Sequence, residues 1–298
     1  MKEWTGHLGA LLVVVVWGTT FVSSKVLLGY GMMPADIFFY RFLMAYLCMS
    51  AVSHHRMWAR SVSDELTLVG LGIMGGSLYF LTENMALTYS TSANVSILVS
   101  TTPIVTALLV SLFYKSERMT GLQVLGSLCA FVGVVLVVLN GQLILHLNPR
   151  GDMLALCASV TWACYSLLLR RVMSRYGAGF ITRKVFGYGV LTILPWYVLV
   201  HPLETSPTVL FRLPVMANLL FLGLLASTGG FLVWNWVMSR LGAVRATNYV
   251  YFQSLITMLV GSVVLHERIT WMALLGCVIL IGGMVLALGK PARVPAET

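Results

Sequence analysis

The chain has 298 residues, of which 58% are hydrophobic and only 10% are charged. Because soluble domains carry about 25% charged residues, this composition excludes a soluble fold and indicates a membrane protein. The formal net charge of +9 would suit a nucleic-acid-binding protein, but the basic residues are placed as topology determinants, so we expect no nucleic-acid partner.

Ten apolar segments are candidates for membrane spans, each of which needs roughly 20 residues to cross the hydrocarbon core. In chain order they cover about residues 7–28, 34–53, 65–88, 92–113, 120–140, 151–171, 180–200, 214–237, 243–265 and 270–288. Several breaks between them hold Gly, Pro or Asn, which favour turns and helix ends. We therefore predict an all-α membrane protein with ten transmembrane helices.

Apart from Lys25, Arg41, Arg183 and Lys184, which lie in spans or at their ends, the Lys and Arg residues gather on one side. When the N-terminus is placed inside, twelve of them lie in the inner loops and termini, and three lie in the outer loops at Arg150, Arg212 and Arg268. This positive-inside bias predicts that both termini are cytoplasmic and that the protein resides in the inner membrane, surrounded by the lipid bilayer.

The two halves of the chain repeat each other at an offset of about 150 residues. A Glu-Arg-x-Thr motif followed by two glycines occurs at Glu117, Gly126 and Gly133 and again at Glu267, Gly276 and Gly283. Each half, 1–145 and 146–298, is predicted to hold five spans, and an odd number inverts the second copy relative to the first. We therefore predict two inverted five-helix repeats around a central cavity, with the glycines of spans five and ten performing the same packing role.

Ionisable groups inside a membrane cost roughly 2.5–3.5 kcal/mol each and by default mark function. Glu83 is the only acid that we place inside a span, and Lys25 and Arg41 lie toward the same outer side. One interpretation is a charged site at which Glu83 exchanges a basic partner for substrate or a proton. The other is a permanent ion pair, or basic side chains that extend to the interface. Lys184, near the inner end of span seven, is a counterpart with the same alternatives.

Aromatic, amide and hydroxyl side chains within the spans form the second group of candidates. Tryptophan normally favours the membrane interface, so Trp17 and Trp162, at matching positions in mid-span, predict walls of a cavity. Hydrogen bonding between helices is the alternative for the polar members. The predicted substrate-binding residues are Trp17, Thr20, Asn84, Trp162, Tyr165, Trp234, Asn235, Tyr251 and Gln253.

No motif in the sequence supports an enzyme. The six histidines do not pair with acids at metal-ligand spacing, and the Gly70-x-Gly72-x-x-Gly75 match follows no strand. The five cysteines all lie in apolar runs, which argues against a disulfide framework. We expect no metal and no cofactor.

The Trp17-Gly-Thr-Thr-Phe21 sequence, Arg41, Pro103 and the doubled Glu-Arg and glycine pattern resemble the drug/metabolite transporter superfamily, in its ten-helix EamA-type branch. The resemblance implies two inverted five-helix repeats around a central cavity, and export, sometimes uptake or exchange, of amino acids and other small metabolites. One departure is Ser254, which stands where the ninth span would carry a proline, so that span is expected to be straighter than its counterpart.

These observations together predict a secondary transporter that exports small polar metabolites such as amino acids, with protons as a candidate coupling ion. A multidrug or lipid-linked sugar transporter of the same fold is an alternative. A membrane-embedded enzyme or a receptor is an alternative of a different class. The sequence assigns no oligomeric state.

Overall fold

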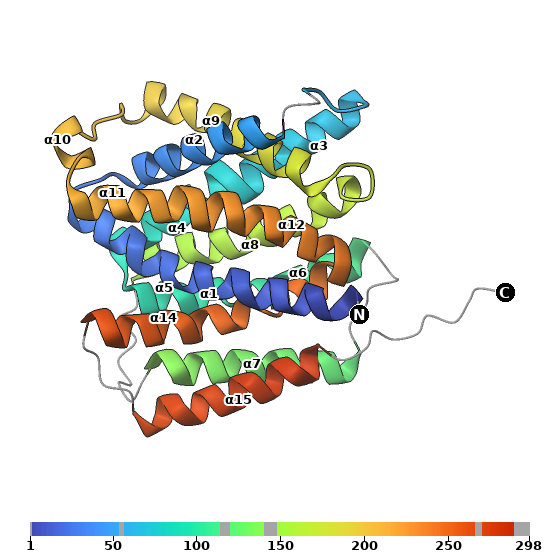
Figure 1. Ribbon diagram of the computed structural model, residues 1–298. Coiled ribbons are helices and arrows are strands. Elements are labelled where there is room, and N and C mark those ends of the chain that lie inside the picture. Colours follow the sequence, from blue (N-terminus) through green and yellow to red (C-terminus); the bar gives the residue numbers. More distant parts are fainter. Residues whose placement is uncertain (1, 54–56, 114–119, 140–147, 266–269, 289–298) are drawn as a thin grey trace.

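The computed structural model describes residues 2–53, 57–113, 120–139, 148–265 and 270–288. Within these ranges every regular element is a helix, and the helices run roughly along one common direction (Figure 1). The Glu-Arg pairs at 117–118 and 267–268 lie outside the described residues. The first half of the chain forms α1 (Lys2–Gly29), α2 (Pro34–Val52), α3 (Val62–Gly72), η1 (Ile73–Ser77), α4 (Leu78–Tyr89), α5 (Ser92–Val99), α6 (Thr102–Phe113) and α7 (Gly121–Leu139).

The second half continues the same bundle. It forms α8 (Pro149–Val172), α9 (Ala178–Leu199), α10 (Pro207–Leu210), α11 (Leu213–Leu220), η3 (Phe221–Gly229), α12 (Gly230–Leu241), α13 (Ala243–Thr247), α14 (Val250–Leu265) and α15 (Trp271–Ala287). Helix α1 begins and α15 ends at the same end of the bundle, which we call the N-terminal end (Figure 1).

Six helical segments of the described chain are long and apolar enough to cross a membrane. They are Trp4–Gly29, Pro34–Val52, Val62–Tyr89, Asn94–Phe113, Pro149–Val172 and Leu213–Leu241. Two shorter apolar helices, Gly121–Val137 and Leu274–Ala287, lie beside each other at one edge of the bundle (Figure 1). The chain is therefore a multi-pass membrane protein, and its exposed Leu, Val and Met side chains are suited to lipid rather than to water.

Local sequence determines where several helices begin. Asn148 accepts hydrogen bonds from the backbone N–H groups of Arg150 and Gly151, and Pro149 occupies the first position of α8, a position that proline favours. Ser61 caps α3 in the same way. Gly242 adopts a φ of 78° between α12 and α13, a conformation that few residues other than glycine tolerate, so the chain turns sharply there.

Spans three and eight both change from α-helix to π-helix partway through. In span three this segment is η1, Ile73–Ser77. Asn84 and Asn235 are 151 residues apart, and adding 151 to the bounds of η1 gives 224–228, which lies within η3 of span eight. Gly76 in η1 departs from helical geometry with φ −119° and ψ −105°. Such segments interrupt the regular hydrogen-bond ladder and are frequent at functional sites.

Spans four and nine are both interrupted by two residues. Helix α5 ends at Val99, and α6 begins at Thr102 with Pro103 next to it. In span nine α13 ends at Thr247 and α14 begins at Val250, so this span is not continuous although it carries Ser254 in place of a proline. The hydroxyl groups of Ser100 and Ser254 form a hydrogen bond of 2.7 Å, so Ser254 contacts the break in span four directly.

The repeated glycines pack helices α7 and α15 against each other. A Cβ atom on Gly126 would lie 2.7 Å from the carbonyl oxygen of Gly283, and one on Gly133 would lie 2.8 Å from that of Gly276. The contact is reciprocal, because the first glycine of each helix faces the second glycine of the other. Spans five and ten thus share one interface, and small residues let their backbones approach closely.

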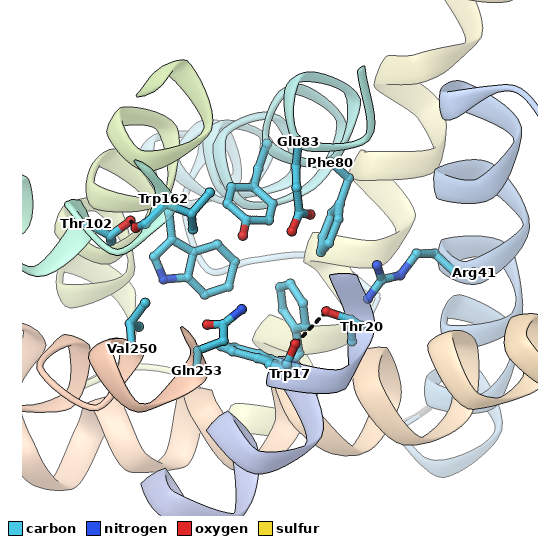
Figure 2. A pocket seen from close by; sticks show the side chains of 12 residues that line it. Trp17, Thr20, Arg41, Phe80, Glu83, Thr102, Trp162, Val250 and Gln253 are labelled. Atoms are coloured by element: carbon cyan, nitrogen blue, oxygen red, sulfur yellow. Dashed lines mark hydrogen bonds between the residues drawn. The ribbon is translucent and has the colours of Figure 1, made fainter. Parts of the chain in front are cut away.

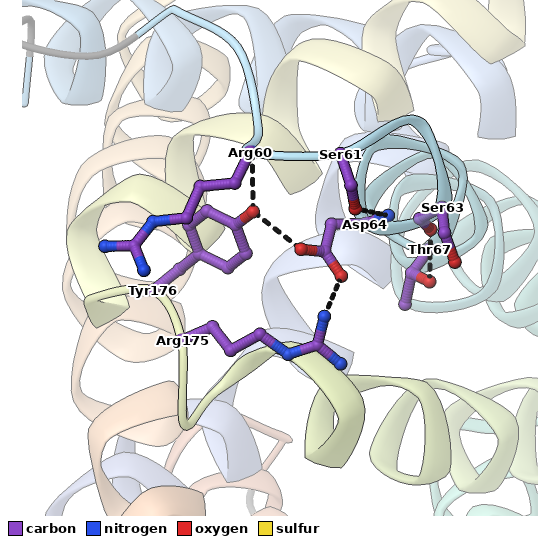
Figure 3. Close-up of polar contacts among 7 residues, drawn as sticks. All are labelled: Arg60, Ser61, Ser63, Asp64, Thr67, Arg175 and Tyr176. Carbon is purple, nitrogen blue, oxygen red and sulfur yellow. Dashed lines mark hydrogen bonds and ion pairs between the residues drawn. The ribbon is translucent and has the colours of Figure 1, made fainter.

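A polar network joins α3 to the α8–α9 connection at the N-terminal end (Figure 3). The buried carboxylate of Asp64 accepts a hydrogen bond of 2.5 Å from Arg175 and one of 2.8 Å from the hydroxyl of Tyr176. The neighbouring Glu65 accepts a hydrogen bond from Lys184 on α9. These contacts tie the start of the third span to the second half of the chain.

Candidate functional site

A small pocket lies in the interior of the bundle, between the two halves of the chain (Figure 2). Its free volume is about 20 Å³, which holds roughly one water molecule. The site is therefore almost closed in this structure. The lining residues come from α1, α2, α4, α5 and α6 and from α8, α12 and α14, and are Trp17, Thr20, Arg41, Tyr79, Phe80, Glu83, Val99, Thr102, Trp162, Phe231, Val250 and Gln253.

Helical periodicity brings these side chains to the pocket. Tyr79 and Glu83 are four residues apart on α4, and Trp17 and Thr20 are three apart on α1, so each pair lies on one face of its helix. On α14, Val250 lies three residues before Gln253. Each helix thus presents one narrow stripe to the site.

Aromatic rings form most of the pocket wall. The rings of Trp17 and Trp162 meet edge to face with centroids 5.2 Å apart, an arrangement that aromatic pairs favour. Tyr79 lies 4.9 Å from Trp162, and Phe231 lies within 5.7 Å of both tryptophans. The two tryptophans that the repeat pattern singled out are therefore direct neighbours.

The π-helical segment η3 positions Trp17. Its indole N–H donates a 2.9 Å hydrogen bond to the carbonyl oxygen of Ala226. A Cβ atom on Gly230 would lie 2.5 Å from the same indole nitrogen, so only glycine leaves room for the ring there. The indole N–H of Trp162 is buried and has no hydrogen-bond partner among the residues that the structure describes.

Arg41 and Glu83 approach the pocket from different walls (Figure 2). Arg41 is 1% exposed and Glu83 is 5% exposed. The Nε–H of Arg41 donates a 3.0 Å hydrogen bond to Ser227, and its guanidinium carbon lies 4.1 Å from the centre of the Phe80 ring. In the described part of the chain no ion pair within 4.0 Å joins the two charges. Both charged groups therefore remain directed at the pocket.

Three neutral polar side chains complete the lining. Gln253 is 5% exposed and points into the pocket from the wall opposite Glu83 (Figure 2). The hydroxyl of Thr20 donates to the carbonyl oxygen of Trp17 at 2.7 Å. Thr102 donates to Val99 in the same way, at 2.6 Å. Nearby backbone carbonyl groups thus engage the threonine hydroxyls, whereas no hydrogen bond engages the Gln253 amide within the described part of the chain.

Four other residues predicted from the sequence pack behind or beside the pocket. Tyr165 donates a 2.5 Å hydrogen bond to Asn235, and Asn235 donates one of 2.8 Å to Thr182, which joins α8, α12 and α9. Asn84 donates to the carbonyl oxygen of Pro34 at 3.2 Å. The fourth, Trp234, is fully buried, with its ring centroid 5.0 Å from that of Trp17. These residues hold the helices around the site and do not line it.

The remaining predicted residues lie away from the pocket. Tyr251 packs into a separate apolar cluster that includes Ile97 and Leu280. It is two residues before Gln253, a rotation that turns it to another face of α14. Lys25 donates to the carbonyl oxygens of Leu87 and Ser90, at 2.5 and 2.9 Å.

Neither lysine completes the charged site. Lys25 caps the end of α4 and lines a larger cavity of about 610 Å³ at the end of the bundle opposite the N-terminal end. It does not pair with Glu83, because the carbonyl groups at the end of α4 lie within its reach. Lys184 belongs to the network at the N-terminal end, with Glu65. Of the four charged candidates, the structure brings together only Arg41 and Glu83.

Several lining residues were not predicted from the sequence. Tyr79, Phe80 and Val99 look like ordinary residues of an apolar span, as do Phe231 and Val250. Two signals could have found some of them. Tyr79 and Phe80 lie about one turn before Glu83, and Phe231 follows Phe80 at the offset of 151 residues that separates the two asparagines. In the described residues, no group of three His, Cys, Asp or Glu side chains is placed to hold a metal ion.

The chain matches the profile of the EamA-like transporter family over residues 4–139 and again over 149–289. It belongs to that family. A solved crystal structure is similar to this EamA-like transporter, with a TM-score of 0.74 and 19% sequence identity. The match covers 95% of this chain and 98% of the chain in the crystal structure, which shows a shared fold.

Three relatives of this EamA-like transporter bear names of transporters or exporters. An uncharacterized transporter of Archaeoglobus fulgidus is 29% identical, over 95% of this chain and 97% of its own. A probable amino-acid metabolite efflux pump of Escherichia coli is 27% identical, over 93% and 92%. A probable terminal-alkyne amino-acid exporter of Streptantibioticus cattleyicolor is 26% identical, over 93% and 91%. The family and these names indicate a transporter rather than an enzyme.

Proposed function

We propose that this protein is a secondary transporter that exports small polar metabolites, such as amino acids, across the cytoplasmic membrane. The observation that carries the proposal is the nearly closed pocket between the two halves, lined by aromatic rings and two opposite charges. Transporter sites lie near the bilayer midplane at the interface between repeats. The names of the relatives from Escherichia coli and Streptantibioticus cattleyicolor support amino acids as the substrate class.

The proposed architecture is ten transmembrane helices in two inverted five-helix repeats, residues 1–145 and 146–298. The family profile matches the chain twice, once in each half. The reciprocal contacts of Gly126 with Gly283 and of Gly133 with Gly276 are those expected across a two-fold axis. Trp17 and Trp162, which occupy matching positions, also contact each other, as residues near such an axis would.

The proposed orientation places both termini in the cytoplasm. The excess of Lys and Arg in the loops on the side of the N-terminus supports it. The network of Asp64, Arg175 and Lys184 at the N-terminal end would then face the cytoplasm.

The transport cycle that we propose is alternating access to the central pocket. The two π-helical segments η1 and η3 provide places at which spans three and eight can bend, because their hydrogen-bond ladders are already interrupted. Glu83 would bind a proton in one half of the cycle and the substrate in the other. A carboxylate can hold only one of them at a time, so export of substrate would be coupled to entry of a proton.

The experiment that tests this function is a counterflow assay in proteoliposomes. Vesicles that contain the purified protein are loaded with one unlabelled amino acid, and uptake of the same labelled amino acid is measured across a panel of twenty. We expect uptake above that of empty vesicles for at least one amino acid, and loss of most of it in Trp162→Ala. Trp271→Ala, at a residue that is 86% exposed on α15, is the matched control and should leave uptake unchanged. Absence of uptake for the whole panel would contradict the proposed substrate class.

A further inference from the structure

We propose that the central pocket binds both charged groups of an α-amino acid, with Arg41 receiving the carboxylate and Glu83 receiving the ammonium group. This inference rests on the proposed function and assigns the substrate-binding roles within it. It concerns the two buried charges of the pocket, which approach from α2 and α4 without pairing directly with each other.

The guanidinium group of Arg41 is held in an orientation that suits a bound carboxylate. Its Nε–H is used by Ser227, and the Phe80 ring supports the face of the guanidinium, with 4.1 Å between the guanidinium carbon and the ring centre. The plane of the group is therefore set by the protein, while its two terminal NH₂ groups remain for a ligand. A guanidinium fixed in this way binds a carboxylate through parallel hydrogen bonds.

Glu83 and the surrounding rings suit an ammonium group. The carboxylate is directed into the pocket beside Phe80 (Figure 2), and Tyr79 also lines the pocket. The rings of Trp17 and Trp162 form adjoining walls. An ammonium group gains from a carboxylate and from the electron-rich faces of aromatic rings, and both contributions grow when water is excluded.

The charge balance of the pocket selects a zwitterion over a simple cation or anion. With Arg41 positive and Glu83 negative, the empty pocket is neutral overall, and a zwitterion leaves it neutral. An amine would add an uncompensated positive charge, and a carboxylic acid an uncompensated negative one. Burying an unpaired charge is costly at a site this far from water. The pocket should therefore reject a ligand that lacks either group.

The test is competition in the counterflow assay, with labelled L-leucine and labelled L-phenylalanine as probes. The competitors for leucine are leucine itself, 3-methylbutylamine and 4-methylpentanoate. Those for phenylalanine are phenylalanine itself, 2-phenylethylamine and 3-phenylpropanoate. For each probe that is transported, we expect the amine and the acid to require at least tenfold higher concentrations than the amino acid for half inhibition. Should neither be transported, the same pair of analogues is made for an amino acid that the panel identifies.

Two substitutions should change this selectivity in opposite directions. Arg41→Gln leaves the pocket negative, so the amine should compete at least as well as the amino acid. Glu83→Gln leaves it positive, so the acid should become the better competitor. Loss of packing alone would weaken all three competitors together. Arg240→Gln and Glu204→Gln, which change the same residue types at exposed positions, should keep the wild-type order.

The outcomes separate this inference from the proposed function. Exchange of amino acids with equal inhibition by the amine and the acid would overturn the binding roles and leave the transporter proposal standing. Failure of every amino acid to exchange would overturn the transporter proposal itself. If a substituted protein does not fold, the tenfold discrimination by the wild-type protein still decides the matter.

Discussion

At the scale of single residues, the central feature is a buried carboxylate and a buried guanidinium that share a pocket but do not form a direct ion pair. Glu83 and Arg41 are each at most 5% exposed. Charges so buried are costly unless they are compensated. Here compensation comes from Ser227, the Phe80 ring and the opposite charge across the pocket. Neither group is locked to the other, so each can bind and release a ligand.

We expect Glu83→Gln to abolish accumulation driven by a pH gradient, because glutamine cannot carry a proton. Its thermal stability should stay close to that of the wild-type protein, since glutamine has nearly the same shape and Arg41 keeps its contacts with Ser227 and the Phe80 ring. Exchange of substrate without a gradient should continue, at lower affinity. The measurement compares gradient-driven uptake, counterflow and thermal unfolding on the same purified protein. Unchanged gradient-driven uptake would remove Glu83 from the coupling mechanism.

The sequence predicted some of these residues and could not have predicted others. Glu83 and Arg41 were found because a charge within an apolar span needs a reason, and Trp17 and Trp162 because the repeat aligns them. Asn84, Asn235 and Tyr165 were also predicted to bind substrate, yet they hydrogen-bond other parts of the protein. An amide or hydroxyl in lipid seeks a partner, and the sequence does not show whether that partner is a helix or a ligand.

At the scale of helices, α7 and α15 depend on two pairs of facing glycines. A Cβ atom on Gly283 would lie 2.3 Å from the backbone nitrogen of Ala130, whereas one on the adjacent Gly282 would meet nothing within 4 Å. A backbone atom cannot move aside without separating the helices. The two neighbouring positions therefore form a matched pair for measuring how much this contact contributes.

Gly283→Ala should destabilise the protein by about 1–3 kcal/mol, the usual cost of overpacking. Gly282→Ala should be neutral, or stabilising by up to roughly 1 kcal/mol, because alanine favours a helix more than glycine does. Thermal unfolding of both variants in the same detergent checks the difference. Equal effects at the two positions would show that the close approach of α7 and α15 is not required for stability.

The helices themselves were largely predictable, but their irregularities were not. Apolar length placed the predicted segments on the observed helices. Pro103 lies beside the break in span four, but the similar break in span nine has no proline to mark it. The π-helical segments η1 and η3 were not predicted from the sequence, and η1 packs closely against other helices. Gly75 shows this, since a Cβ atom there would lie 2.2 Å from the ring of Tyr165 on another span.

At the scale of the whole molecule, the two halves enclose the pocket almost completely. About 20 Å³ remains free at the centre, whereas the cavity beside Lys25 holds about 610 Å³. Composition, charge distribution and the recurring motifs were enough to predict a membrane transporter. They could not predict a closed site, since closure depends on how side chains from eight helices meet. A substrate larger than water can enter only if the halves move apart.

Alternating access therefore requires that one residue of the pocket be reachable from each side of the membrane in turn. Gln253→Cys, in a protein whose five native cysteines are replaced, is the most direct probe, and Tyr251→Cys is its control on another face of α14. In proteoliposomes of known orientation, a membrane-impermeant thiol reagent is added to the outside or enclosed inside, with and without the transported amino acid. We predict that Gln253→Cys reacts from both sides and is protected by substrate, while Tyr251→Cys stays inert. Reaction from neither side, or the same reactivity at both positions with no protection, would contradict a central site with alternating access.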